Sequence, residues 1–333
     1  MKLAIEAPFV PERRVFSGQG LVLLVGGLIL LGKGGVAETV LRRATQAAAS
    51  YEEPDPVFNA FLHAAWCALG AMAPISGKWR LEEAYREGRR AAAVLEELGA
   101  THGQALSLYY FAVAAMHLGR HEDARDAAAR SVEIARRVGI DEGWPLLFLG
   151  RALLRLDKAD EAMSVIAPLR SSPDCTVAQM LPVIEAEAHL RLGDLVRASN
   201  EARPACDGVS PRLARLAACV LARAEILLGR PAEALSAVDK ARAQQTSDGL
   251  ESDVDLLTLR AEALTAVGDA PAAREAITKA RELVLRIGSE VADVALRESF
   301  YQNVEPCALA LALSERWGVD EAVQTARREE GAT

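Results

Sequence analysis

The sequence predicts an all-α fold, a solenoid of about seven helix-turn-helix repeats that ends in C-terminal capping helices. Three observations predict it: a short motif that recurs at a nearly constant interval, small residues at fixed positions before each copy, and an apolar content of 51% with only 5% aromatic residues. Alanine supplies much of the apolar content. Since one helix pair cannot bury its own apolar side, units of this kind are stable only when they stack in series.

A seven-residue motif of the form Leu-Gly-x-x-x-x-Ala marks the turn inside each repeat. Its clearest copies occupy residues 118–124, 156–162, 192–198, 228–234 and 267–273. The final alanines of these copies are separated by 38, 36, 36 and 39 residues, an interval that suits two helices with short connections. Related segments at 31–37 and 77–84, the latter with two extra residues in the turn, extend the series toward the N-terminus.

Small residues stand seven and five positions before each of these turns. They are Ala112, Gly150, Ala186, Ala222 and Ala261 in the first set and Ala114, Ala152, Ala188, Ala224 and Ala263 in the second. A small side chain lets neighbouring helices pack at a short distance. The glycine of the motif is expected to end the first helix in the left-handed conformation, and Asp157, which replaces it once, is one of the few other residues that adopt it.

Together these features resemble the tetratricopeptide repeat, which has a small residue in the middle of its first helix, a glycine at the turn and an alanine early in its second helix. The resemblance covers residues 17–288, although the family's large aromatic residue on the first helix is mostly missing and its usual proline is absent or displaced. More loosely, the long period and the closing segment 297–318 are similar to the C-terminal repeat arrays of bacterial signalling proteins that join such a solenoid to a Ser/Thr kinase or a STAND-type ATPase.

The domain organisation follows from the extent of the repeats. Residues 1–16 are interpreted as a lead-in, 17–288 as the solenoid, 289–318 as two capping helices and 319–333 as a polar tail. No Gly/Ser-rich or Pro-rich linker divides the middle of the chain. We therefore expect one elongated solenoid rather than two globular domains.

Charge and cysteine content exclude several classes of protein. The 333 residues carry 38 Lys and Arg against 46 Asp and Glu, a formal charge of −8, which has the wrong sign for binding nucleic acid. The five cysteines are odd in number and widely spaced, and no two form a C-x-x-C pair. Neither a disulfide framework nor a zinc site is indicated, and a reducing, cytoplasmic location is the simplest expectation.

Residues 21–31 form the most apolar stretch of the chain. As a helix, eleven residues rise only about 16 Å, roughly half the thickness of a bilayer core, so the stretch is interpreted as a buried helix and no membrane association is expected.

Motifs for catalysis or cofactor binding are not recognised. The segment from Gly27 to Lys33 matches the start of a phosphate-binding loop, but Gly34 stands where Ser or Thr must reach Mg²⁺, and the segment lies in a helix-and-turn register. His117 and His121 are separated by a turn and are interpreted as exposed or capping residues rather than metal ligands. No nucleophile elbow is present. The protein is therefore predicted to be no enzyme and to need no cofactor.

By analogy with the resembled family, positions ten, six and two before each turn are expected to line a concave groove. The predicted groove residues are Tyr109, Val113, His117, Leu147, Arg151, Arg155, Val183, Glu187, Arg191 and Arg223. A guanidinium group suits bidentate contact with a carboxylate, so we expect the arginines to hold the charged groups of an acidic peptide or protein. The alternative is that these arginines are solvated or pair with Glu187 and nearby acidic residues.

The predicted function is that of a non-catalytic scaffold, or of the sensing arm of a signalling system, that binds a peptide or protein partner in this groove. One alternative is self-assembly into a homo-oligomer, with the apolar helix 21–31 partly at the interface. A small-molecule binder or an enzyme is a further alternative, for which the sequence shows no convergent set of catalytic groups.

Overall fold

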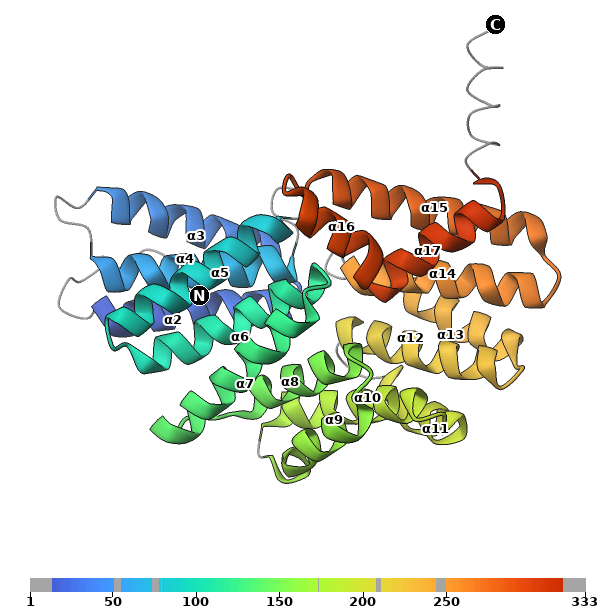
Figure 1. Cartoon of the computed structure of the whole chain (residues 1–333), viewed down its shortest axis with the longest axis horizontal. Helices are drawn as coiled ribbons and strands as arrows, with labels where there is room; N and C mark the ends of the chain where they lie inside the picture. Colours follow the sequence, from blue (N-terminus) through green and yellow to red (C-terminus); the bar gives the residue numbers. More distant parts are fainter. Residues whose placement is uncertain are drawn as a thin grey trace, which may run out of the picture. The chain divides into compact units, whose positions relative to one another are not determined.

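The computed structural model describes residues 14–50, 55–73, 78, 80–172, 174–207, 211–243 and 250–319 (Figure 1). Within these ranges the chain is built from helices and contains no β-strand, which confirms the all-α prediction. Most of the predicted lead-in and nearly all of the predicted polar tail, residues 1–13 and 320–333, lie outside the described residues. Residues 14–16, also assigned to the lead-in, belong to the first described helix.

Helix pairs follow one another along the chain at the predicted interval. The pairs are α2 (Arg14–Leu30) with α3 (Gly34–Ala49), α4 (Pro56–Met72) with α5 (Leu81–Glu97), α6 (Thr101–His117) with α7 (His121–Val138), α8 (Gly143–Arg155) with α9 (Ala159–Ile166), α10 (Cys175–Arg191) with α11 (Leu195–Ala205), α12 (Pro211–Leu227) with α13 (Pro231–Ala243), and α14 (Leu250–Ala266) with α15 (Ala270–Ser289). A short 3₁₀ helix, η2 (Ala167–Ser171), follows α9, and α16 (Val294–Asn303) and α17 (Glu305–Arg316) follow the last pair.

The turns inside the pairs have the predicted backbone. Gly119, Gly193, Gly229 and Gly268 have positive φ angles of 71°, 80°, 73° and 88°, and Asp157 takes the same conformation with φ 56°. A residue in this conformation lets the chain leave the first helix and start the second within three residues.

The small residues predicted for close helix approach are buried, and the alanines among them are at most 2% exposed. Two glycines outside the predicted sets also lie at close helix contacts. A Cβ atom added at Gly103 of α6 would lie 2.6 Å from the ring of Phe61 on α4. A Cβ atom at Gly88 of α5 would lie 2.6 Å from the Cys67 sulfur and 3.0 Å from Phe111 of α6. These positions exclude larger residues because the helices meet there at van der Waals distance.

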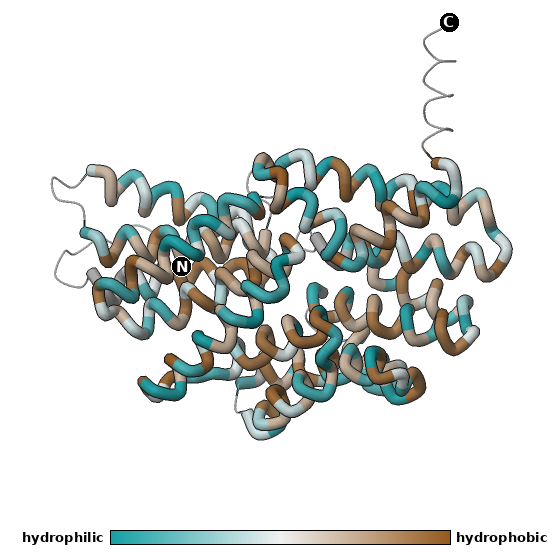
Figure 2. The backbone as a smooth tube through the Cα atoms, viewed as in Figure 1, coloured by the Kyte–Doolittle hydropathy of each residue, from teal (hydrophilic) through white to brown (hydrophobic). Residues whose placement is uncertain are grey.

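Contacts between Cα atoms divide the chain into two compact units, residues 1–152 (the N-terminal unit) and 153–333 (the C-terminal unit). The division falls inside α8, where the sequence offers no linker. Figure 2 shows apolar and polar residues alternating around the helices of either unit, as expected for helices with one buried side. At the C-terminal end, α17 packs on α14 and α15 through the buried Cys307, Ala310 and Leu313.

Helix α2 contains the most apolar stretch and differs from the expectation of a buried helix. Val22, Val25 and Ile29 are buried, whereas Leu23 is 56% and Leu24 42% exposed. The helix thus has one side in the core and one apolar side facing solvent, and self-assembly through it stays a prediction. Among the described residues, no helix is both long enough and apolar enough to cross a bilayer.

Candidate functional site

The predicted groove arginines of the C-terminal unit all have carboxylate partners. Arg155 of α8 forms an ion pair with Glu187 of α10, and both side chains are nearly buried. Arg191 lies 3.3 Å from Asp157 and also contacts Glu305 at the start of α17. The Arg155–Glu187 and Arg191–Asp157 bonds connect successive repeats, and the Arg191–Glu305 bond connects α10 with α17.

Arg223 of α12 extends this network to α14. Its guanidinium lies 2.9 Å from Glu262 and 3.4 Å from Asp255. Burial opposes the charge of Arg223, but the nearby carboxylates Asp255, Glu262 and Glu305 outweigh it and raise the pKa of the guanidinium. Three arginines thus meet five carboxylates here, and their capacity to hold anions is used within the chain.

The remaining predicted groove residues are mostly buried. Val113, Leu147 and Val183 belong to the apolar core. Arg151 is buried as well, with its guanidinium carbon 5.6 Å from the centre of the Phe148 ring. His117, expected to be exposed or capping, is the last residue of α6 and is buried. The packing of neighbouring helices, which the sequence does not display, covers these positions.

Tyr109 is the predicted groove residue that lines a pocket in the N-terminal unit. The pocket has a volume of about 400 Å³ and lies among α2, α6, α7 and the start of α8, with walls that include Leu23, Gly27, Leu106 and Trp144. Two first helices, α2 and α6, supply most of it. We call it the tyrosine pocket.

Aromatic rings stabilise one wall of the tyrosine pocket. The Tyr109 ring packs against Tyr110, Phe148 and Trp144 with centroid distances of 4.6, 5.2 and 6.4 Å. Burial raises the pKa of Tyr110, so that its phenol stays neutral at any physiological pH. A neutral, rigid aromatic wall suits an apolar side chain.

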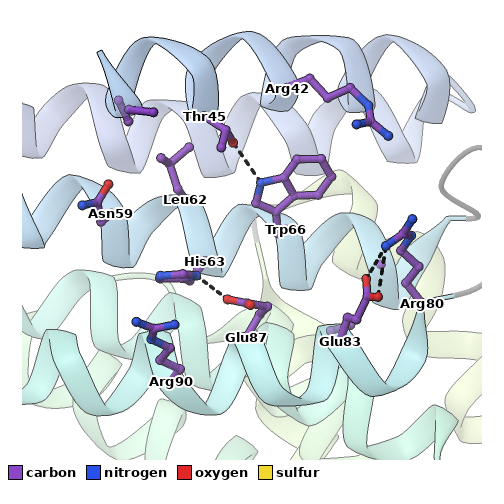
Figure 3. A pocket seen from close by; sticks show the side chains of 14 residues that line it. Arg42, Thr45, Asn59, Leu62, His63, Trp66, Arg80, Glu83, Glu87 and Arg90 are labelled. Atoms are coloured by element: carbon purple, nitrogen blue, oxygen red, sulfur yellow. Dashed lines mark hydrogen bonds and ion pairs between the residues drawn. The ribbon is translucent and has the colours of Figure 1, made fainter. Parts of the chain in front are cut away.

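A larger cleft of about 720 Å³ lies between α3 and α5, over α4, also in the N-terminal unit (Figure 3). The floor is a stripe of α4 at helical spacing that includes Asn59, Leu62, His63 and Trp66. The lining residues of α3 are Arg42, Thr45, Ala48 and Ala49, and those of α5 are Glu83, Ala84, Glu87 and Arg90, with Arg80 directly before α5. We call this the α3–α5 cleft.

Most polar groups of the α3–α5 cleft bond to one another or to neighbouring residues. The Trp66 indole N–H donates to the Thr45 hydroxyl at 3.1 Å, and the Arg80 guanidinium donates to Glu83 at 2.7 Å. His63 Nδ1 contacts the Glu87 carboxylate (Figure 3). Arg42 donates to Glu38 on its own helix at 2.7 Å. Most polar side chains of the cleft therefore already have a partner within the chain.

Arg90 and Asn59 are the exceptions, since neither side chain has a hydrogen-bond or ionic partner among the described residues. Figure 3 shows both toward one end of the cleft, with Arg42 and Arg80 toward the other. Arg90 was not predicted because it lies on a second helix, and Asn59 was not predicted because the groove residues were taken from later repeats, although it lies on the first helix α4. The available signal was the run of small residues on α3, which leaves the space open.

No group of three or more His, Cys, Asp or Glu residues in the described ranges is placed to hold a metal ion. The segment from Gly27 to Lys33 is the end of α2 and the following turn, as the sequence predicted, rather than the strand-to-helix loop that binds phosphate.

Searches against protein-family models and against curated proteins found no match. Solved structures do match. One is NprR in complex with its cognate peptide NprX, with 13% identity, coverage of 95% of this chain and 88% of that chain, and a TM-score of 0.55. Another is a Rap protein complexed with Competence and Sporulation Factor, with 14% identity, coverage of 93% and 99%, and a TM-score of 0.52. The chain has the fold of the tetratricopeptide-repeat proteins.

A third match, the APC/C hetero-tetramer Cut9–Hcn1, has 12% identity and a TM-score of 0.54, and covers 89% of this chain and 52% of that chain. At such low identities the likeness extends to the fold alone. Tetratricopeptide-repeat solenoids share their stacking of helix pairs, while the residues that line their surfaces differ. What the present solenoid binds has to be argued from its own pockets.

Proposed function

We propose that this protein is a non-catalytic solenoid that binds a peptide or a segment of a partner protein. The observation that carries the proposal is the tyrosine pocket, an apolar and aromatic cavity of about 400 Å³ supplied mainly by first helices. Cavities of this size and composition hold ligands that insert an apolar group. Two structures of the same fold, NprR with NprX and the Rap protein with its factor, contain a bound peptide or factor, which supports this class of ligand.

In this proposal, the partner packs an apolar side chain against the wall formed by Tyr109 and Trp144, and the rest of the peptide follows the surface of α2 and α6. The exposed Leu23 at the pocket adds apolar area to the contact. The arginines predicted to hold acidic groups are a weaker part of the proposal. An incoming carboxylate there would have to displace Glu187, Asp157, Glu305 or Glu262 from its arginine.

A glycine replacement tests the pocket without disturbing the core. Gly27 lines the pocket, and a Cβ atom added there meets no other atom within 4 Å, so Gly27→Leu adds an apolar side chain at the pocket from an open position. Gly35→Leu is the matched control, since Gly35 of α3 has equally open space and does not line the pocket. Peptides selected on the wild-type protein from a library of short random sequences are then titrated against both variants.

We expect Gly27→Leu to weaken binding of the selected peptides by about tenfold or more, as for a lost apolar anchor. Gly35→Leu should bind them as the wild type does. Failure of the library to yield any peptide that binds the wild-type protein would contradict the proposed function itself.

A further inference from the structure

The α3–α5 cleft is a second cavity of the N-terminal unit, lined mainly by helices other than those of the tyrosine pocket. The cleft is bounded by two second helices, α3 and α5. It stays open because these two helices pack differently against their neighbours. Helix α5 packs closely on α6 along its far side, where Gly88 meets Phe111. Helix α3 instead meets α4 over a short contact and lines the cleft with Thr45, Ala48 and Ala49, which leave about 720 Å³ open.

The middle of the cleft suits an apolar side chain. Leu62 and Trp66 form its floor, and the one polar atom of Trp66 is already bonded to Thr45. The part of the indole that faces the cleft therefore has no hydrogen bond left to offer, and a polar ligand group placed over it would lose its contact with water without compensation.

The end of the cleft near Arg90 suits an anion. The other two arginines that line the cleft are paired with carboxylates, Arg42 with Glu38 and Arg80 with Glu83, while Arg90 has no such partner among the described residues. Arg90 therefore supplies the positive charge that is left for an anion. A carboxylate that binds a guanidinium in a partly desolvated cleft makes a strong, charge-assisted bond.

Asn59 adds a recognition element that favours a peptide backbone. Its amide can donate to a carbonyl and accept from an N–H, and it lies toward the same end as Arg90 (Figure 3). From Asn59 to Gly70, the stripe of α4 that forms the floor rises about 16 Å, which equals the length of about five residues of extended chain.

We propose that the α3–α5 cleft binds a short extended peptide whose carboxylate pairs with Arg90 and whose large apolar side chain packs on Trp66 and Leu62. The proposal rests on the peptide-binding function proposed above and adds to it a second site with a stated ligand chemistry. The carboxylate comes either from an acidic side chain or from the end of the peptide.

The test uses the full chain and a signal that arises in the cleft. The indole N–H resonance of Trp66 is assigned by its loss in Trp66→Phe, which keeps an aromatic ring in the same place. Pools of blocked peptides of about five residues, with one fixed Glu among random apolar positions, are titrated against the labelled protein. Parallel pools carry Gln in place of Glu, or Gln with a free C-terminal carboxylate, and so separate the two sources of the anion.

We expect the Glu pool, the free-carboxylate pool or both to shift the Trp66 resonance, and the blocked Gln pool to need about tenfold more peptide for the same shift. Arg90→Ala should remove the difference between the pools. Arg89→Ala, which removes the neighbouring exposed arginine that does not line the cleft, should leave it unchanged.

Equal shifts with carboxylate and Gln pools, or an undiminished difference in Arg90→Ala, would overturn the proposal. If peptides bind the wild-type protein but leave Trp66 unmoved, and Gly27→Leu abolishes that binding, the cleft is excluded while the proposed function stands. If no peptide binds in either experiment, both are wrong.

Discussion

One arginine of the N-terminal unit and three arginines of the C-terminal unit meet opposite environments. In the C-terminal unit, Arg155, Arg191 and Arg223 each contact at least one carboxylate from another helix or turn. In the N-terminal unit, Arg90 borders an open cleft and has no such partner among the described residues. The difference arises from the neighbouring helices, because α10, α14 and α17 present acids to the arginines whereas α3 borders the cleft mainly with small uncharged residues.

Position on a helix face therefore does not by itself make an arginine a ligand-binding group. A guanidinium that already pairs with a carboxylate offers little to a ligand, since binding would exchange one ion pair for another. An unpaired guanidinium at the edge of an apolar cleft is available to a ligand, because the bond to the ligand replaces no ion pair within the protein. The contrast can be tested by removing single side chains from the two environments.

The largest effect is expected for Glu187→Ala. This change leaves Arg155, whose side chain is 13% exposed, without its ion-pair partner, and we expect a loss of about 2–3 kcal/mol in the free energy of unfolding. Urea unfolding followed by circular dichroism measures it. Glu187→Gln, which keeps a hydrogen-bond acceptor, should cost less, and a loss below about 1 kcal/mol in Glu187→Ala would show that the pair is not structural.

A smaller effect is expected for Glu305→Ala. The Glu305 side chain is 50% exposed, and its pair with Arg191 is largely open to solvent, so we expect a loss of about 0.5–1 kcal/mol that shrinks at high salt. The same unfolding experiment at low and high ionic strength checks this. A loss that is large and independent of salt would mean that Glu305 fixes the position of α17 on the face of α10 and α12.

The smallest effect is expected for Arg90→Ala. Because Arg90 is exposed and has no intramolecular partner in the described part of the chain, the free energy of unfolding should change by less than about 0.5 kcal/mol. Arg89→Ala serves as the reference for the loss of one exposed arginine from α5. A clear destabilisation by Arg90→Ala alone would reveal an internal partner and remove the contrast with the C-terminal unit.

Much of the fold could be predicted because each repeat carries its own local signals. Gly119 and Asp157 sit at the predicted turns with positive φ, and Ala112 and Ala114 are buried where close helix approach was expected. These features depend on residues a few positions apart, so they are visible in one repeat at a time.

Local signals within one repeat could not predict whether the groove arginines pair with carboxylates of the same chain. The partners of Arg155 and Arg223 lie 32 and 39 residues further along the chain, about one repeat away, and Glu305 lies 114 residues from Arg191. Whether such residues meet depends on the angle at which successive pairs stack. Pairing with Glu187 was one of the alternatives predicted from the sequence. The order of residues along the chain does not fix the angle at which successive helix pairs stack.

The sequence by itself determined that helix pairs form, where each pair turns and which small residues face one another, since these follow from backbone preferences and side-chain size within about one repeat. Only the tertiary structure decided which arginines are neutralised and where a cleft stays open. Both outcomes depend on the distances between side chains of different helices, which small differences in helix packing change by the few ångströms that separate an ion pair from a free charge.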